Sequence, residues 1–332
     1  MLLAIETSCD ETGVALFSED GKLISHLLYS QVAIHSPFGG IVPEIASRKQ
    51  LEVLYPLIKE LLKQNNIEIS QLKAVAATFG PGLIGSLLVG VSLAKAISFA
   101  LKIPLIAVDH LQAHLLAVFL EKEIEFPFIG LLVSGGHTAL FLINSFFEFY
   151  VIGHTKDDAA GEAFDKVAKL LGLPYPGGPI ISQLAEKGDP KAINLPRPLL
   201  EDKSLDFSFS GLKTAVLNYI KNHSYRVEDL CAGFEEAVCD VLVYKTFRAV
   251  DLFKVPRVVV AGGVAANKRL RQRFREKAFN TGVEIYFPSL EFCTDNAAMV
   301  GLLGYKQWQE KKYADLNTEA YARAVFKKLS IP

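Results

Sequence analysis

Hydrophobic and polar positions repeat along the chain in two blocks of the same design. Each block opens with three short apolar runs separated by polar or glycine-containing turns, which is typical of strands in an antiparallel meander. The six expected strands span residues 2–8, 14–18, 23–30, 128–134, 138–145 and 146–153. The repeat is one of architecture and not of residue identity, and it predicts two similar α/β lobes within one chain.

After each set of three strands, apolar residues at helical spacing alternate with short apolar runs, which predicts alternating helices and strands. In the first block these elements are a helix at 43–64 that begins with Pro43, a strand at 73–78, a helix at 84–100 and a strand at 104–108. In the second they are a helix at 160–171, helical segments to about residue 250, a strand at 257–262, a helix at 267–279, a strand at 283–287 and a helix at 295–311. The proline- and charge-rich stretch 187–205 is expected to be an exposed insertion.

The composition indicates a substantial core but no overall attraction for nucleic acid. Half of the 332 residues are hydrophobic, 21% are charged, and the formal net charge is −1. Binding to nucleic acid would need a local basic patch, and residues 267–277 are the best candidate, with lysines and arginines opposed only by Glu276. Such a helix face is either a binding surface or an ordinary solvated face.

Cysteine spacing and one uncharged stretch bear on the compartment. The four cysteines have no CxxC spacing and the chain begins directly with a strand pattern, so a reducing cytoplasm fits best. Residues 74–94 carry no charge, but the sequence FGPG at 79–82 interrupts them. Only about a dozen apolar residues then precede Lys95, fewer than the ~20 that a membrane-spanning helix needs. We therefore expect a strand, a turn and a buried helix here, and no membrane.

Two turns at matching places of the repeat carry polar residues, in the sequences IETSCDETG at 5–13 and VSGGHT at 133–138. Such residues are either ordinary turn formers or a polar lip over a ligand site. The second turn favours the ligand site, because Gly135 and Gly136 let backbone N–H groups approach an anion, with Ser134 and Thr138 as further donors.

Three further stretches have local features of a nucleotide site. The sequence AGGVAANKRL at 261–270 places a Gly-Gly turn between a buried strand and a helix, where nucleotides bind but ordinary tight turns also occur. The helix at 160–171 carries Asp165 on the face opposite its terminal leucines. The rigid turn YPGGP at 175–179 exposes backbone that could hold a ribose or an amino-acid moiety.

Two histidines four residues apart begin an apolar helical run in the sequence DHLQAHLLAV. His110 and His114 share one helical face, so they are either packed core histidines or ligands of one metal ion. Leu111 stands where a zinc protease of the HExxH type has its glutamate base, so peptide hydrolysis lacks its usual proton acceptor. A third ligand must come from elsewhere, and Asp295 at a predicted helix start is the best candidate.

Together and in this order, these stretches resemble the TsaD family, the transferases that make N6-threonylcarbamoyladenosine in tRNA. The resemblance rests on AIETSCDET, HLQAH, VSGGHT, DDAAGEAFDKVAKLLGLPYPGGP, DFSFSGLKTA, AGGVAAN and CTDNAA, and it covers nearly the whole chain. It implies an α/β fold of two duplicated RNase-H-like lobes around a nucleotide cleft, as in actin, Hsp70 and sugar kinases. The lobes would be 1–108, completed by a C-terminal helix at about 305–325, and 109–304, with the metal and nucleotide sites.

The resemblance implies a cytoplasmic, metal-dependent acyltransferase. It would transfer the threonylcarbamoyl group from threonylcarbamoyl-adenylate to the N6 amine of adenosine 37, in tRNAs that read codons starting with A, and release AMP. Its implied partners are tRNA, a TsaB-type paralogue docked on the first lobe and a TsaE-type ATPase. The implied cofactor is one divalent metal ion, iron(II) or alternatively zinc, with no organic cofactor.

Carried over motif by motif, the resemblance assigns His110, His114 and Asp295 as the metal ligands. Some members of the family have an acid where Ser182 stands, so that position is left out. The reaction needs a proton acceptor for the adenine amine, and Glu11 or Asp10 on the first turn is our candidate. The implied substrate-binding residues are Val133, Ser134, Gly135, Gly136, His137, Asp165, Gly178 and Asn267.

Three other functions fit parts of the pattern. A metallopeptidase would explain the HxxxH spacing but lacks the glutamate. A small-molecule kinase of the same fold would use ATP and a magnesium-binding carboxylate, without needing the two histidines. A non-catalytic scaffold paralogue would need neither the metal nor the nucleotide residues, all of which are present here.

Overall fold

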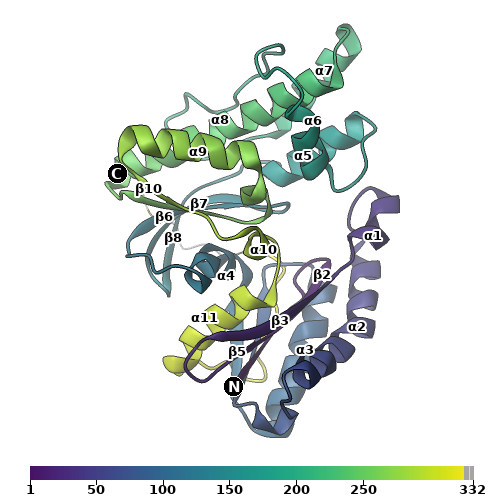
Figure 1. Cartoon of the computed structure of the whole chain (residues 1–332), viewed down its shortest axis with the longest axis vertical. Helices are drawn as coiled ribbons and strands as arrows, with labels where there is room; N and C mark the ends of the chain where they lie inside the picture. Colours follow the sequence, from purple (N-terminus) through teal and green to yellow (C-terminus); the bar gives the residue numbers. More distant parts are fainter. Residues whose placement is uncertain (325–328, 330–332) are drawn as a thin grey trace. The chain divides into compact units, whose positions relative to one another are not determined.

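The computed structural model describes residues 1–324 and 329, and the chain forms two compact units (Figure 1). Unit 1 contains Met1–Ile124 and the segment that begins at Thr294, and unit 2 contains Glu125–Cys293. Each unit is built around one five-stranded sheet.

The boundary between the two units lies after Ile124 and not after residue 108, where it was expected. Residues 109–124 belong to unit 1. The physical reason is that α4 (His110–Leu116) and the 3-10 helix η3 (Ala117–Leu120) pack against α11 (Ala297–Gln309) of the same unit. The apolar side chains of this short segment are therefore buried in unit 1.

The sheet of unit 1 has the strand order β3-β2-β1-β4-β5. The antiparallel β1–β2 and β2–β3 pairs form the expected meander, while β4 runs parallel to both β1 and β5. The carboxyl ends of β1, β4 and β5 therefore lie at the same edge of the sheet. The strands are β1 (Leu2–Glu6), β2 (Glu11–Phe17), β3 (Leu23–Ser30), β4 (Ala74–Gly80) and β5 (Leu105–Asp109).

Helices cover both faces of this sheet (Figure 1). The helices α2 (Pro43–Gln64) and α3 (Ile84–Leu101) lie on one face, where Leu3 and Ile5 of β1 join their hydrophobic cluster. Helix α11 covers the other face, and its Gly304 contacts Leu2. Because alternate side chains of β1 meet a helix on either side, the whole strand reads as an apolar run with a single acid at its end.

The sheet of unit 2 repeats this topology with the order β10-β9-β6-β7-β8. The three strands β6, β7 and β8 form an antiparallel meander, and β9 pairs parallel with both β6 and β10. The expected duplication of an α/β unit with an RNase-H-like strand order is therefore confirmed. The strands are β6 (Phe128–Val133), β7 (Thr138–Ser145), β8 (Glu148–His154), β9 (Arg257–Ala261) and β10 (Glu284–Tyr286).

The main helix of unit 2 is α8, whose side chains are buried along most of its length in the hydrophobic core. The stretch 187–205 is not simply an exposed insertion as expected, because Ile193, Leu195 and Leu205 are buried in the same core. The helices of unit 2 are α5 (Ala160–Leu170), α6 (Gly177–Ala185), α7 (Ser210–Asn222), α8 (Val227–Phe253), η4 (Gly263–Ala266), α9 (Lys268–Thr281) and α10 (Leu290–Cys293). Unit 1 also has three short helices, α1 (Val32–His35), η1 (Ser36–Phe38) and η2 (Ile69–Gln71).

The C-terminal segment belongs to unit 1 as expected, but it does not form the expected helix at about 305–325. Residue 325 lies outside the described residues. Helix α11 ends at Gln309, and the described residues after it contain no helix. They instead run as an extended segment along the sheet, where Ala314 forms a bridge to Leu105 of β5. Further on, the Tyr321 N–H donates to the carbonyl oxygen of Phe79 at 2.9 Å.

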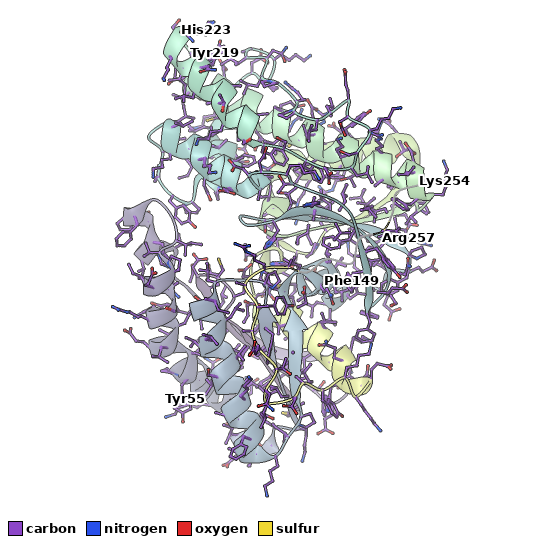
Figure 2. All side chains as sticks on the ribbon, turned by 180° about the vertical axis from the view of Figure 1, so that it is seen from behind. Tyr55, Phe149, Tyr219, His223, Lys254 and Arg257 are labelled. Carbon is purple, nitrogen blue, oxygen red and sulfur yellow. The ribbon has the colours of Figure 1, made fainter. Side chains whose placement is uncertain are left out.

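Helix α3 is the one helix among the described residues that is long and apolar enough, by length and composition alone, to cross a membrane. In the structure Val91, Ala94 and Ile97 are buried in the hydrophobic cluster of unit 1, as in a core helix. Its other side is exposed beside α2, on which Tyr55 is labelled in Figure 2.

The close packing of α11 on the sheet can be tested with two matched glycine substitutions. A Cβ at Gly304 would lie 2.6 Å from Cβ of Ala76, so Gly304→Ala should lower the free energy of unfolding by about 1–3 kcal/mol. Gly85 is also helical, but a Cβ there meets Ser47 at an ordinary 3.4 Å. Gly85→Ala should leave stability unchanged or raise it by up to ~1 kcal/mol. Equal urea midpoints for the two variants would contradict the packing.

Candidate metal and nucleotide sites

The two histidines stand at the start of α4, directly after the buried strand β5. Asp109 is the N-cap of α4, and its Oδ1 accepts hydrogen bonds from the N–H groups of Leu111 and Gln112, both at 2.9 Å. The hydroxyl of Tyr321 donates to the other carboxylate oxygen at 2.7 Å. Because the cap fixes the first turn, His110 and His114 are held on one buried side of the helix.

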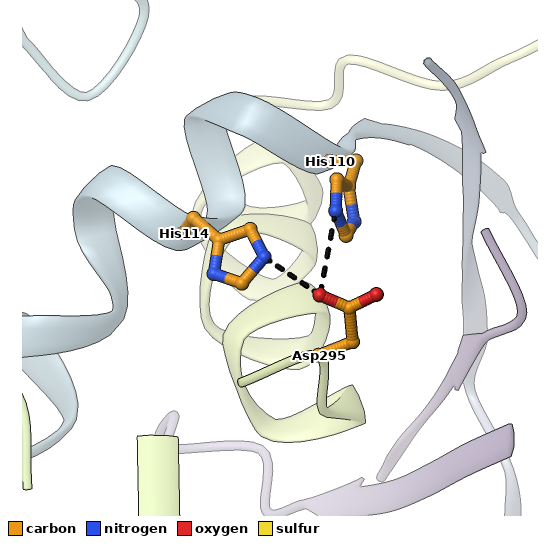
Figure 3. A group of neighbouring side chains, drawn as sticks. All are labelled: His110, His114 and Asp295. Carbon is orange, nitrogen blue, oxygen red and sulfur yellow. Dashed lines mark hydrogen bonds and ion pairs between the residues drawn. The ribbon is translucent and has the colours of Figure 1, made fainter. Parts of the chain in front are cut away.

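Asp295 completes the group from a segment far along the chain. Its Oδ1 lies 3.0 Å from Nε2 of His114 and 3.6 Å from Nε2 of His110 (Figure 3). The two imidazole rings meet edge to face with centroids 4.6 Å apart, and one ligand atom from each of the three residues lies within 4.8 Å of the others. The structure therefore brings the three expected ligands together, and it places all of them in unit 1 and not in the second lobe.

The charges around this triad suit a cation. Burial lowers the pKa of His114, which favours the neutral imidazole that can bind a metal. Burial also acts to lower the pKa of His110, but the carboxylates of Asp295 and Glu6 outweigh it and raise that pKa to about 9. Two imidazoles and one carboxylate form a donor set that fits iron(II) or zinc.

Glu6 is a site residue that the sequence reasoning missed. It is the last residue of β1, is fully buried, and has Oε2 3.3 Å from Nδ1 of His110. The available signal was the one acid at the end of the otherwise apolar strand LLAIE. A charged residue in such a strand is rare unless it is paired.

The turn after Glu6 is tied down by Gln50 of α2, whose Nε2 donates to the carbonyl oxygens of Cys9 at 2.8 Å and Glu11 at 3.2 Å. Glu11 itself accepts a hydrogen bond from the Ser30 hydroxyl at 2.8 Å through Oε1, whereas Oε2 is buried without a partner among the described residues. Burial raises the pKa of Glu11 to about 7, although the hydrogen bond from Ser30 acts to lower it. A carboxyl group with such a pKa can exchange a proton near neutral pH.

Asp10, the alternative proton acceptor, is also buried in unit 1. Burial and the charge of Asp295 raise its pKa above the ordinary value. Asp295 acts in the same direction on Glu11, so both candidates lie within the electrostatic influence of the triad.

In unit 2, the turn between β6 and β7 has the open backbone that the sequence predicted. The Ser134 N–H donates to the carbonyl oxygen of His137 at 2.8 Å, and the His137 N–H donates to the Ser134 hydroxyl at 3.1 Å. A Cβ at Gly135 or Gly136 would meet nothing within 4 Å, whereas one at Gly161 would lie 2.8 Å from Cα of Gly135. Helix α5 therefore starts directly beside a turn that is open on its other side, which is a setting for an anionic group.

Asp165 and the second glycine pair are joined by a hydrogen bond between α5 and α6. The Gly177 N–H donates to Oδ1 of Asp165 at 2.7 Å. A Cβ at Gly177 would lie 2.4 Å from that of Ala168, so only glycine allows this approach of the two helices. Gly178 follows in the first turn of α6.

Asn267 lies beside a cavity of about 330 Å³ in unit 2. Its Oδ1 caps α9 by accepting from the Leu270 N–H, and its Nδ2 donates to Glu235 at 2.6 Å and to the Ser182 hydroxyl at 3.3 Å. Sequence reasoning also missed Glu235, a carboxyl group on α8 whose pKa is raised by burial. The cavity is lined by Ser182, Ala185, Glu186, Pro190, Ala232, Glu235, Glu236, Lys268, Arg269 and Gln272.

The basic segment at 267–277 is partly neutralised within unit 2. Arg269 donates to both carboxylate oxygens of Glu236, at 2.7 and 3.0 Å. Arg273 pairs with the same glutamate and with Asp240, the latter at 2.8 Å. These two arginines are held in an internal network. Arg275 and Lys277 of the same segment are exposed and form no ion pair with an acid among the described residues.

Comparisons with known proteins show the family of this chain. A model of the TsaD family, described as tRNA N6-adenosine threonylcarbamoyltransferase, matches residues 22–302. A protein of that name from Geotalea uraniireducens is 52% identical over 309 residues, which are 92% of this chain and 90% of the relative. Another from Kosmotoga olearia is 52% identical over 321 residues, which are 96% of this chain and 97% of the relative.

One solved structure bears on the fold. Component A of the (R)-2-hydroxyglutaryl-CoA dehydratase from Acidaminococcus fermentans aligns with 92% of this chain and 98% of its own, with a TM-score of 0.57 and 17% sequence identity. At this level of identity the similarity concerns the fold alone.

Proposed function

The chain belongs to the TsaD family of tRNA N6-adenosine threonylcarbamoyltransferases, and from this premise we propose its reaction in detail. The protein transfers the threonylcarbamoyl group from threonylcarbamoyl-adenylate to the N6 amine of adenosine 37, in cytoplasmic tRNAs that read codons starting with A, and releases AMP. The observation that carries this proposal is the convergence of His110, His114 and Asp295 in a chain that also retains the family's glycine turns.

The triad would hold one divalent metal ion, with iron(II) expected and zinc as the alternative, and no organic cofactor is required. When bound, such an ion supplies Lewis-acid polarisation of an acyl or carboxylate oxygen and a fixed point for orienting it. The chain's own contribution is to present two imidazole nitrogens and one carboxylate oxygen from a buried position.

The residues of unit 2 would bind the adenylate. Gly135 and Gly136, between Val133 and His137, offer open backbone for the phosphate. The cavity beside Asn267 has the volume and the polar lining for the adenosine moiety. Asp165 holds the first turn of α6, and thus Gly178, in place through the Gly177 N–H.

The chemistry demands little covalent catalysis because the adenylate is already activated. The N6 amine attacks the carbamoyl carbon, the bond from that carbon to the phosphate oxygen breaks, and AMP leaves. The amine loses one proton in this process, and Glu11 is our first candidate to accept it, with Asp10 as the second. The unpartnered Oε2 of Glu11 supports the choice, because it is a buried acceptor without a donor among the described residues.

The surface of unit 1 fits a protein partner of the TsaB type. Helices α2 and α3 expose a hollow of about 500 Å³ that is lined almost entirely by apolar residues, with Leu51 73% exposed. A contiguous apolar surface of this kind marks an interaction site. We propose that a TsaB-type paralogue docks here and that a TsaE-type ATPase joins the assembly.

A small-molecule kinase of the same fold is the remaining alternative for unit 2. It would leave the buried histidines and Asp295 without a role. A metallopeptidase is disfavoured by Leu111, because the helix has no acid at the position of the usual base.

The proposed reaction predicts a change in cellular tRNA. Nucleoside mass spectrometry of tRNA from cells depleted of this protein should show loss of threonylcarbamoyladenosine, restored by the wild-type chain and by the exposed-surface control Glu310→Gln. Asp295→Asn and Asp165→Asn should each lower transfer by about 100-fold or more. Only Asp295→Asn should also lose the metal in the purified protein. An unchanged nucleoside level after depletion would refute the proposal.

The assignment of Glu11 predicts the pH dependence of transfer from preformed adenylate. A base must be unprotonated, so the rate should rise with pH up to a pKa of about 7 and then level off. Glu11→Gln should abolish this rising limb of the pH–rate profile and lower the rate by about 10²–10⁴-fold. Ser30→Ala removes the hydrogen bond that lowers the pKa of Glu11, so it should move the limb to higher pH. A limb that persists in Glu11→Gln would exclude this base.

The partner surface predicts the effect of one charge. Leu51→Glu should abolish association with a TsaB-type protein in size-exclusion chromatography, because an unpaired carboxylate would be buried at the contact. The matched control is Phe279→Glu, at a 90% exposed apolar residue of α9 in unit 2, which should leave the association unchanged. Intact binding of Leu51→Glu would place the partner elsewhere.

A further inference from the structure

The buried acid at the end of β1 has no role in the proposed reaction so far. Glu6 is fully buried in unit 1, at the end of a strand whose other side chains are apolar. A carboxylate costs several kcal/mol to bury unless donors surround it. Its contacts therefore show what it is built to do.

Glu6 accepts two hydrogen bonds and faces a histidine ring nitrogen, and these three contacts come from three different parts of unit 1. Oε1 accepts from the Ser8 N–H at 2.6 Å, in the turn after β1. Oε2 accepts from the Thr78 hydroxyl at 2.6 Å, in the adjacent parallel strand β4, and faces Nδ1 of His110 at 3.3 Å. The carboxylate thus lies where the carboxyl ends of neighbouring parallel strands and the start of α4 meet.

The two nitrogens of His110 face different groups. Nε2 faces Oδ1 of Asp295 at 3.6 Å, within the triad. Nδ1 faces Glu6 and also the Ser8 hydroxyl, which is 3.1 Å away. Both nitrogens face a carboxylate, but only Nδ1 lies within hydrogen-bond distance of one, so the proton of a neutral ring is favoured on Nδ1 and the lone pair on Nε2.

The second histidine has no such support. Nδ1 of His114 is buried without a hydrogen-bond partner among the described residues. Of the two histidines, therefore, only His110 has neighbouring groups among the described residues that can fix the ring orientation and the tautomer through Nδ1.

We propose that Glu6 is a positioning residue that accepts the Nδ1–H of His110 and thereby presents Nε2 of that ring to the metal ion. This inference rests on the proposed function, because it takes the triad to be a metal site. It adds a residue outside the three ligands that determines how tightly the ion is held. Carboxylates that accept from a ligating histidine in this way change metal affinity by about 10–100-fold.

The competing explanation is that Glu6 only ties β4 to the turn at Ser8. Two nearly isosteric substitutions separate the two roles. In Glu6→Gln, the amide oxygen can take the place of Oε1 and still accept from the Ser8 N–H, so that the NH₂ group takes the place of Oε2. That NH₂ group then donates to Thr78 and to Nδ1 of His110, which drives the proton to Nε2 and blocks its lone pair. Thr78→Val removes one donor to the same carboxylate without touching His110.

The test is a cobalt(II) titration of the purified full chain against a chelating dye, with the visible cobalt spectrum as a second readout. Glu6→Gln should weaken binding by about 10–100-fold and alter the spectrum. Thr78→Val should lower the melting temperature but keep the wild-type affinity and spectrum. Wild-type affinity and spectrum in Glu6→Gln would overturn the proposal, as would an equal loss of affinity in both variants.

Asp295→Asn separates this inference from the proposed function. If Asp295→Asn binds cobalt as tightly as the wild type, the triad is not the metal site and both proposals fail. If it loses the ion while Glu6→Gln retains it, only the role of Glu6 fails.

A measurement on the wild type keeps the proposal testable should Glu6→Gln not fold. Nitrogen NMR of the histidine rings in the zinc-loaded protein should show His110 with a protonated Nδ1 and with zinc on Nε2. Zinc on Nδ1, or an unprotonated Nδ1, would overturn the proposal.

Discussion

Negative charge buried at one edge of the unit 1 sheet is the constraint on which the rest of the site depends. Glu6 and Asp295 both lie against His110, with carboxylate oxygens 3.3 and 3.6 Å from its two ring nitrogens. Such a pair of acids is stable only with positive charge between them, from a protonated imidazole or from a metal ion. The caps and hydrogen bonds around α4 hold the histidines where that charge is required.

The two units share one sheet topology but differ in the turn after the first strand. In unit 1 the backbone of the turn after the first strand is bonded by side chains, because the Ser8 N–H donates to Glu6 and the Cys9 carbonyl oxygen accepts from Gln50. In unit 2 the equivalent turn contains Gly135 and Gly136, around which the backbone is open. The same strand order therefore presents ionisable side chains in one unit and peptide N–H groups in the other.

In unit 2, charged side chains of α8 and α9 pair with one another and hold these two helices together. Glu236 and Asp240 of α8 accept from arginines of α9, and this joins two helices that cover the sheet. A binding surface for the phosphates of tRNA needs cations without internal partners. In the basic segment of α9, Arg269 and Arg273 are paired internally, which leaves Arg275 and Lys277 as the exposed cations without an ion pair to an acid among the described residues.

Local pattern predicted most of the elements and the duplicated topology, because periodicity acts over short distances along the chain. The resemblance to the TsaD family supplied most of the predicted site residues. Only the tertiary structure decided which distant residues meet. Asp295 reaches His114 across 181 positions, and Glu6 is recognised as a partner of His110 only once the parallel strands are aligned. The pairing of Arg269 and Arg273 with acids of α8, and the unit boundary after Ile124, were likewise decided by contacts between distant residues. Pairing and burial are long-range properties, and a sequence of charges or apolar residues does not say which other residues will satisfy them.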